Sequence, residues 1–367
     1  MLRRSFKIVL LSILIVLAAA FFIYNKGRTF VFENGQSPSS SDDGLKQILG
    51  GLTLEQKIGQ LFIIGFDGKV LDSKIEKLIK ELHPGGVLLL GKNIENAEQL
   101  SFLIDSLQEI AKEDTGLLLL IAVDQEGGVV SRIDWAEKTA QSEIENKEQA
   151  YLIGKSRGSD LKGLGINLNL APLLDQTFSG DFISDRSFKK GFEDTGEIAS
   201  FLIKGQRDSG IFSCIKHFPG YGGIYFNPED DLATLDSLPD ISSFEKAGGA
   251  FPEMVMVSNV IYKEIEKDVP FSFSQKSVQL LKEKIKGDYL VVSDDLSQYS
   301  LLNNFSLKEI VSSPIKSGVD MLIFSDWRMS PEKGVAALKE AVMNSDLSEG
   351  IINDKVLKVI ELKGKLK

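Results

Sequence analysis

Short apolar runs alternate with amphipathic segments along almost the whole chain, and this alternation constrains the fold more than any other sequence feature. Short apolar runs bounded by turn-forming residues are typical of buried strands, and longer amphipathic segments are typical of helices. Their alternation predicts a parallel sheet with crossover helices. The predicted strands cover residues 60–65, 86–90, 117–123, 167–173, 211–215, 254–257, 289–292 and 321–324. The clearest predicted helices cover residues 73–82, 97–112, 195–209 and 274–286.

Eight strands with this spacing indicate an α/β fold, a (β/α)8 barrel of the TIM type that forms a single domain over residues 44–367. The competing fold is an open, doubly wound sheet. Polar side chains lie at or shortly after the predicted strand ends: Asp124, Asp175, Lys216, Asn259, Asp294 and Asp326. The carboxyl ends of barrel strands meet at one mouth, whereas in an open sheet they spread along an edge. This placement favours the barrel, with terminal helices predicted in residues 327–367.

The composition suits one large folded domain. The chain has 367 residues, of which 43% are hydrophobic, and this is enough for a full core. The net charge of −10 argues against a nucleic-acid partner and makes a neutral substrate more natural. The single cysteine, Cys214, cannot form an internal disulfide, and its place in an apolar run predicts a buried thiol.

The N-terminal segment differs from the rest of the chain. Three basic residues precede an uncharged run over residues 8–24, which as a helix would be about 25 Å long. Residues 21–24 are bulky and do not resemble a cleavage site, so we predict a membrane anchor over residues 1–24, with a cleaved secretory signal as the alternative. Residues 25–43 are predicted to form a flexible polar tether. The flanking charges weakly favour a barrel outside the cytoplasmic membrane, with this helix as its only membrane contact.

The segment from Lys216 to Gly222 reads Lys-His-Phe-Pro-Gly-Tyr-Gly and follows the predicted strand at 211–215. It places an ammonium and an imidazole at the barrel mouth, although both groups could equally well be structural. The segment resembles the KHFPGHG signature of family 3 glycoside hydrolases of the β-N-acetylglucosaminidase type. The resemblance implies that Lys216 and His217 bind hydroxyl groups of the terminal sugar. Tyr221 stands where the signature has its second histidine.

Asp294 follows the apolar run at 289–292, where a rigid strand could aim its carboxylate at a sugar. Taken alone, Asp294 or Asp295 could instead cap the next helix. The stretch over residues 293–298 resembles the family's SDDLSM motif, with glutamine in place of methionine. The resemblance implies that Asp294 is the nucleophile that forms a covalent glycosyl-enzyme.

Two further segments match the family in its order along the chain. Residues 124–132 resemble the motif DQEGGRVxR, which implies that Asp124 and Arg132 bind the substrate sugar. Residues 185–188 resemble the (D/E)RSF element, which implies the same for Arg186, although an isolated loop arginine is more often a solvated surface group. The resemblance extends from residue 44 to the C-terminus and implies neither a metal ion nor a cofactor.

The family's catalytic histidine has no counterpart here, because the chain contains only His83 and His217. Retaining cleavage of a glycosidic bond needs a proton donor near the ionised nucleophile. The family's histidine position, twelve residues after His217, falls on Glu229. Glu229 could act if its surroundings raise its pKa, and Asp230 or Asp231 would replace it if the loop differs in length. A solvated acidic loop without a catalytic part is the alternative.

The sequence therefore predicts a membrane-anchored, extracytoplasmic glycosidase that removes terminal β-linked N-acetylglucosamine from cell-wall-derived or related amino sugars. Asp294 would attack the sugar and Glu229 would protonate the leaving group. The first alternative is a sugar-binding or scaffold protein that has kept the pocket and lost the proton donor. The second is a glycosidase of altered specificity, because Val129, Tyr221 and Asn259 replace polar residues of the family motifs.

Overall fold

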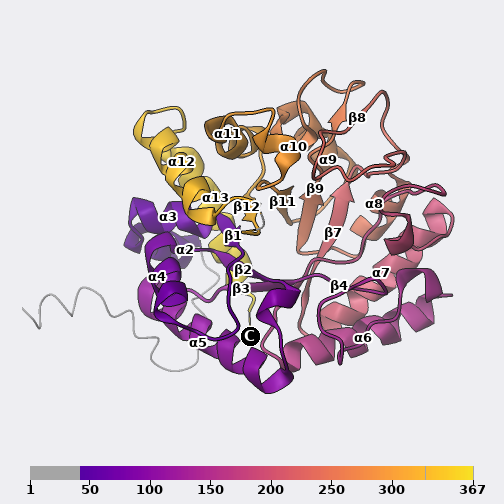
Figure 1. Cartoon of the computed structure of the whole chain (residues 1–367), viewed down its shortest axis with the longest axis horizontal. Coiled ribbons are helices and arrows are strands. Elements are labelled where there is room, and N and C mark those ends of the chain that lie inside the picture. Colours follow the sequence, from indigo (N-terminus) through magenta and orange to yellow (C-terminus); the bar gives the residue numbers. More distant parts are fainter. Residues whose placement is uncertain (1–41, 327, 367) are drawn as a thin grey trace, which may run out of the picture. The chain divides into compact units, whose positions relative to one another are not determined.

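Eight parallel strands close into a barrel in the computed structural model, which describes residues 42–326 and 328–366 (Figure 1). The order around the barrel is β1, β12, β11, β9, β7, β6, β3 and β2, and β2 pairs again with β1. The barrel strands are β1 (Phe62–Ile64), β2 (Gly86–Leu89), β3 (Leu120–Val123), β6 (Leu168–Asn169), β7 (Phe212–Phe218), β9 (Met254–Val257), β11 (Leu290–Asp295) and β12 (Met321–Phe324). The predicted single-domain barrel is confirmed for the described residues.

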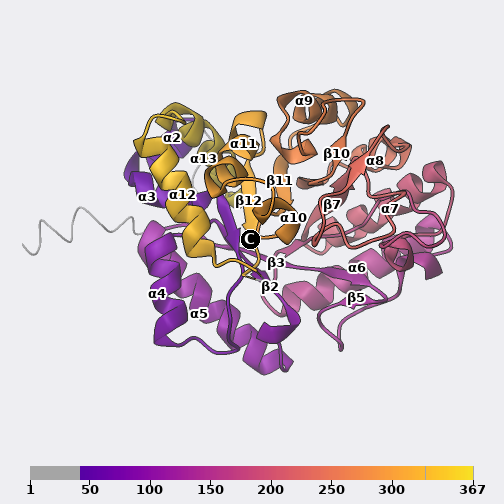
Figure 2. The same ribbon diagram turned by 45° about the horizontal axis from the view of Figure 1, so that its top comes forward.

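Helices connect the strands and form the outer layer around them, as the two views show (Figures 1 and 2). The helices are α2 (Asp42–Gly51), α3 (Leu54–Gln60), α4 (Ser73–Leu82), α5 (Ala97–Thr115), α6 (Lys147–Gly163), α7 (Phe192–Asp208), α8 (Ser242–Gly248), α9 (Gln275–Lys284), α10 (Tyr299–Leu302), α11 (Leu307–Ser317), α12 (Pro331–Met343) and α13 (Glu349–Lys363). The strands are buried on both faces because helices cover them outside and side chains fill the barrel inside. Helices α12 and α13 are the predicted terminal helices.

Helix α4 illustrates how local sequence determines these elements. Asp72 accepts hydrogen bonds from the backbone N–H groups of Lys74 and Ile75, at 3.0 and 2.8 Å, and so caps the first turn. Ile75 and Ile79 lie one helical turn apart and are buried against the barrel. The helix ends at His83, which adopts the left-handed conformation with φ of 51°. Capping and apolar spacing are local signals, and the predicted bounds of this helix are confirmed.

The loops that follow the strands carry two small sheets. In the first, β4 (Gln125–Gly127) pairs antiparallel with β5 (Val130–Ser131), directly after β3. In the second, β8 (Thr234–Leu235) pairs in parallel with β10 (Ile261–Tyr262). These pairs stiffen the loops after β3, β7 and β9, which are the loops at the mouth of the barrel.

Two strands extend further than their apolar patterns predict. Strand β7 continues to Phe218, so Lys216 and His217 lie within the strand and not after it. Strand β11 likewise includes Asp294 and Asp295. In both strands the pairing with a neighbour shifts register near this end, where polar residues continue the strand beyond the predicted apolar run. These polar side chains lie at the carboxyl ends of the strands, which form the mouth of the barrel.

The predicted anchor and nearly all of the predicted tether lie outside the described residues. Helix α2 begins at Asp42, which the sequence places in the tether. Every helix in the described part of the chain is too short or too polar to cross a bilayer. Cys214 is buried in β7 as predicted, and burial raises the pKa of its thiol.

Candidate active site

One cavity of about 490 Å³ is lined by all seven residues that the sequence predicts to bind or cleave the substrate. They are Asp124, Arg132, Arg186, Lys216, His217, Glu229 and Asp294. These residues lie at the ends of β3, β6, β7 and β11 or in the loops that follow them. They are far apart in sequence and converge because the barrel closes. The cavity is therefore the candidate active site, while the catalytic role of each residue stays a prediction.

A buried carboxylate joins three of these residues. Glu126 is 1% exposed and accepts hydrogen bonds from Nε and Nη2 of Arg186, at 3.0 and 2.7 Å. The Lys216 ammonium lies 2.6 Å from Glu126 and donates to Asp124, also at 2.6 Å. Burial alone would raise the pKa of Glu126, but the adjacent guanidinium and ammonium keep it well below its usual value. Glu126, Arg186 and Lys216 therefore stay charged and hold one another in place, which suits the binding of sugar hydroxyl groups.

A second buried carboxylate, Asp175, organises the segment with the family signature. Its Oδ2 accepts a hydrogen bond from the backbone N–H of His217 at 3.0 Å and lies 3.0 Å from the ring Nδ1 of the same residue. Its Oδ1 accepts from the backbone N–H of Tyr221 at 2.8 Å. The rings of His217 and Tyr221 pack with their centroids 4.7 Å apart. Asp175 therefore sets the position of both rings.

Asp294 lies at the end of β11, where neighbouring groups hold the chain. Its Oδ1 accepts from the backbone N–H of Asp295 at 2.7 Å. The side chain of Asp295 accepts from the hydroxyl groups of Ser297, at 2.7 Å, and of Ser325, and burial raises the pKa of this carboxyl despite these bonds. Asn259 donates to the backbone carbonyl of Asp295 at 3.1 Å. Asp295 and Asn259 therefore support the strand end that carries Asp294.

Glu229 is about half exposed and lies at the edge of the cavity, in the loop between β7 and β8. Arg328 donates to its backbone carbonyl at 3.1 Å and lies 3.5 Å from its Oε2. The backbone N–H of Ser300 donates to the same carbonyl at 3.0 Å. Burial, followed by the charges of Asp294 and Asp295, raises the pKa of Glu229, and Arg328 opposes this effect. A raised pKa makes a carboxyl more suitable as a proton donor beside a second carboxylate.

The two carboxylates that follow Glu229 lie elsewhere. Asp230 forms an ion pair with Arg328 and accepts a hydrogen bond from Nδ2 of Asn227 at 2.8 Å. The residues that line the described cavity include Glu229 but neither Asp230 nor Asp231. Of the three carboxylates that the sequence leaves open, this geometry favours Glu229.

Gln125 builds the turn that presents Arg132. Its Oε1 accepts from the backbone N–H groups of Arg132 and Ile133, at 2.9 and 3.0 Å. Arg132 then lines the cavity, and its buried Nε has no hydrogen-bond partner among the described residues. Val129 lies at the tip of the β4–β5 hairpin and is 71% exposed, so it does not line the cavity. Valine at position 129, in place of the motif's arginine, therefore removes no polar contact from the lining of this cavity.

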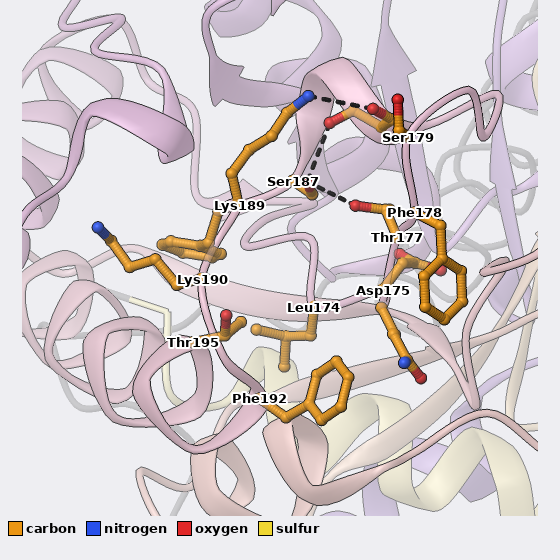
Figure 3. A pocket seen from close by; sticks show the side chains of 13 residues that line it. Leu174, Asp175, Thr177, Phe178, Ser179, Ser187, Lys189, Lys190, Phe192 and Thr195 are labelled. Carbon is orange, nitrogen blue, oxygen red and sulfur yellow. Dashed lines mark hydrogen bonds between the residues drawn. The ribbon is translucent and has the colours of Figure 1, made fainter.

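A second pocket, of about 400 Å³, contains none of the predicted site residues (Figure 3). Inside it, Lys189 donates to the hydroxyl of Ser184 at 3.0 Å, and Thr177 donates to Ser187 at 2.8 Å. Asp175 forms part of the wall, but its oxygen atoms accept hydrogen bonds from the signature segment. We therefore assign no chemistry to this pocket. In the described residues, no group of three or more His, Cys, Asp or Glu side chains could hold a metal ion.

Sequence reasoning missed the structural roles of three residues at this site. Glu126 lies in the same motif as Asp124, and Asp175 follows a predicted strand, so both occupy positions that the strand-end argument could have identified. Arg328 is different, because it lies 99 residues from Glu229 in the loop after β12. No local pattern indicates that Arg328 contacts the loop that carries Glu229.

A closed barrel with two carboxylates and a charged, hydrogen-bonding cluster at its mouth is compatible with the chemistry of a glycoside hydrolase. The chain belongs to glycosyl hydrolase family 3, because residues 53–362 match the profile described as "Glycosyl hydrolase family 3 N terminal domain". The predicted family is confirmed, and so is the predicted class of enzyme, a glycosidase that hydrolyses O-glycosyl bonds.

Relatives with known names agree with this membership. A beta-hexosaminidase of Idiomarina loihiensis is 28% identical over 286 residues, which are 72% of this chain and 84% of the relative. The structure of a family 3 β-N-acetylglucosaminidase from Paenibacillus sp. FPU-7 has a TM-score of 0.80 at 30% identity over 86% of this chain, which spans only 62% of that protein. A β-N-acetylhexosaminidase from Beutenbergia cavernae has a TM-score of 0.77 at 28% identity, over 85% of this chain and 99% of that one.

Proposed function

We propose that this protein is a retaining glycosidase that removes terminal β-linked N-acetylglucosamine from cell-wall-derived or related amino sugars. One observation carries the proposal: Asp294 and Glu229 line the same cavity as the charged cluster of Asp124, Glu126, Arg186 and Lys216. The names of the relatives support the identity of the sugar. The five remaining cavity residues would hold this sugar: Asp124, Arg132, Arg186, Lys216 and His217.

The reaction would proceed in two steps. In the first, the Asp294 carboxylate bonds to the anomeric carbon while the bond to the leaving oxygen breaks, and that oxygen takes the proton of Glu229. In the second, water bonds to the same carbon, gives its proton to Glu229, and Asp294 is released as a carboxylate. The raised pKa of Glu229 supports this division, because Glu229 must be protonated when the first step begins.

The test compares the full-length chain with three variants, Asp294→Asn, Glu229→Gln and Asp230→Asn. Each is incubated with an aryl β-N-acetylglucosaminide and with the β-linked disaccharide of N-acetylglucosamine. We expect Asp294→Asn to abolish turnover of both substrates. We expect Glu229→Gln to reduce disaccharide hydrolysis much more than aryl hydrolysis, because the aryl group leaves with little protonation. Asp230→Asn is the matched control, since Asp230 does not line the cavity, and it should retain activity.

The results distinguish the remaining alternatives. If unmodified protein binds the sugar but turns over no more than Asp294→Asn, the chain is a binding protein and the proposal is wrong. The exposure of Glu229 and the opposing charge of Arg328 are the observations that favour this alternative. If Glu229→Gln hydrolyses the disaccharide normally and Asp230→Asn does not, the proton comes from Asp230.

We also propose that residues 1–24 anchor the enzyme and that the barrel lies outside the cytoplasmic membrane. The proposal rests on the basic and then apolar N-terminal sequence. Full-length protein should sediment with membranes after an alkaline wash, and an externally added protease should cleave the tether in intact cells. A soluble extracellular product that lacks the apolar segment would instead identify a cleaved signal.

A further inference from the structure

Tyr221 contacts the proposed nucleophile, Asp294, through a hydrogen bond. Its phenol donates a hydrogen bond to Oδ2 of Asp294, across a separation of 73 residues. The other oxygen of Asp294 accepts from the backbone N–H of Asp295 at 2.7 Å. Among the described residues, each oxygen of the proposed nucleophile therefore has one hydrogen-bond donor, and the donor from Tyr221 is a side chain.

The surroundings of Tyr221 hold its phenol in this position. The residue is 5% exposed, its ring packs on His217, and its backbone N–H donates to Asp175 at 2.8 Å. Burial, followed by the charge of Asp294, raises the pKa of the phenol well above its usual value. The phenol is therefore protonated at neutral pH and acts as a donor.

We propose that Tyr221 is a positioning residue that stabilises the Asp294 carboxylate as it leaves the sugar in the second step. This inference rests on the proposed function. The charge on Asp294 is lost in the first step, when its oxygen bonds to the anomeric carbon. It returns in the second step, when water bonds to that carbon and the electron pair of the ester bond returns to the carboxylate. A donor to this carboxylate lowers the barrier of the step in which the charge forms.

The second step should therefore depend on Tyr221 more than the first. We expect Tyr221→Phe, which removes only the hydroxyl group, to lower kcat about 10- to 100-fold. The substrate is a dinitrophenyl β-N-acetylglucosaminide, whose leaving group departs readily, so that the second step limits kcat. The ratio kcat/KM reports the first step and should change far less, so KM should fall together with kcat. Mass spectra of the quenched reaction should show the covalent glycosyl-enzyme accumulating in Tyr221→Phe.

Two further variants complete the experiment. Tyr289→Phe is the matched control, because it also removes a phenol that donates a hydrogen bond, here to the carbonyl of Ile285 at 2.9 Å, outside the cavity. Its kcat should equal that of the unmodified protein. Tyr221→His also removes the phenol, and its shorter imidazole does not extend as far towards Asp294, so it too should lower kcat and accumulate the adduct. Tyr221→His also carries the test if Tyr221→Phe does not fold.

The inference is overturned if Tyr221→Phe retains full kcat. It is equally overturned if kcat and kcat/KM fall together without a covalent adduct. An inactive unmodified protein would refute the proposed function and this inference with it. An active unmodified protein with an unaffected Tyr221→Phe would refute this inference alone.

Discussion

Replacing Glu126 with glutamine should destabilise the folded chain by about 3 kcal/mol, the lower end of the range for breaking a buried ion pair. Glu126 is 1% exposed and interacts with two cations. Lys216 is 3% exposed, but in the variant it keeps its bond to Asp124. Arg186 is 21% exposed, so water replaces part of its lost interaction with Glu126. Glutamine has nearly the same shape, so a cavity adds little to the loss.

Urea unfolding measures this change as a shift of the midpoint at constant slope. The pKa of Glu126 lies below its usual value of 4.5 in the folded chain, so the unfolded chain binds more protons as the pH falls. The stabilisation from Glu126 is therefore complete above about pH 4.5 and is lost progressively below it. The difference in unfolding free energy between the unmodified protein and Glu126→Gln should therefore also shrink as the pH falls, because glutamine resembles the protonated carboxyl.

Asp208→Asn is the matched control for this measurement. It breaks an ion pair of similar length, 2.7 Å to Lys204, on the surface of α7, and should change the midpoint very little. The reasoning is wrong if Glu126→Gln shifts the midpoint no more than Asp208→Asn does. It is also wrong if the shift caused by Glu126→Gln is the same at neutral and at acidic pH.

Two further predictions concern the pH dependence of activity and of stability. Arg328 lowers the pKa of Glu229, so Arg328→Met should move the basic limb of the kcat/KM profile for the disaccharide to higher pH; a move to lower pH would contradict this. Burial lowers the pKa of Lys363 from 10.5 to about 7. Between pH 7 and pH 10.5 the unfolded chain therefore binds one proton at Lys363 that the folded chain does not. Unfolding free energy should rise with pH in that window by up to about 1.4 kcal/mol per pH unit, and Lys363→Met should remove this rise. Urea titrations across the window check it, and an equal rise in both proteins would refute it.

The sequence predicts the barrel well because its signals are local. Most barrel strands contain a short apolar run, and many helices carry their own periodicity and caps, as in α4 with Asp72 and His83. Asp124 and Asp294 can be placed at the carboxyl ends of two strands because each comes directly or shortly after a predicted apolar run. Strand ends are predicted less well, since β7 includes His217 beyond its apolar run, and pairing with the neighbouring strands decides where a strand stops.

The members of the candidate site are also largely predictable, because the motifs that carry them are contiguous in sequence. The contacts between them are not. Lys216 meets Asp124 across 92 residues, and Arg186 meets Glu126 across 60. These pairs form because β3, β6 and β7 are neighbours in the closed barrel. No spacing within a motif specifies them.

By itself, the sequence determined the fold class, the family and the set of carboxylates from which a nucleophile and a proton donor can be chosen. Only the tertiary structure decided that Glu229, and neither Asp230 nor Asp231, lines the cavity that contains Asp294. It also decided that Tyr221 donates to Asp294. The physical reason is that apolar periodicity acts over a few residues, whereas a hydrogen bond depends on atoms that only barrel closure brings within about 3 Å of each other.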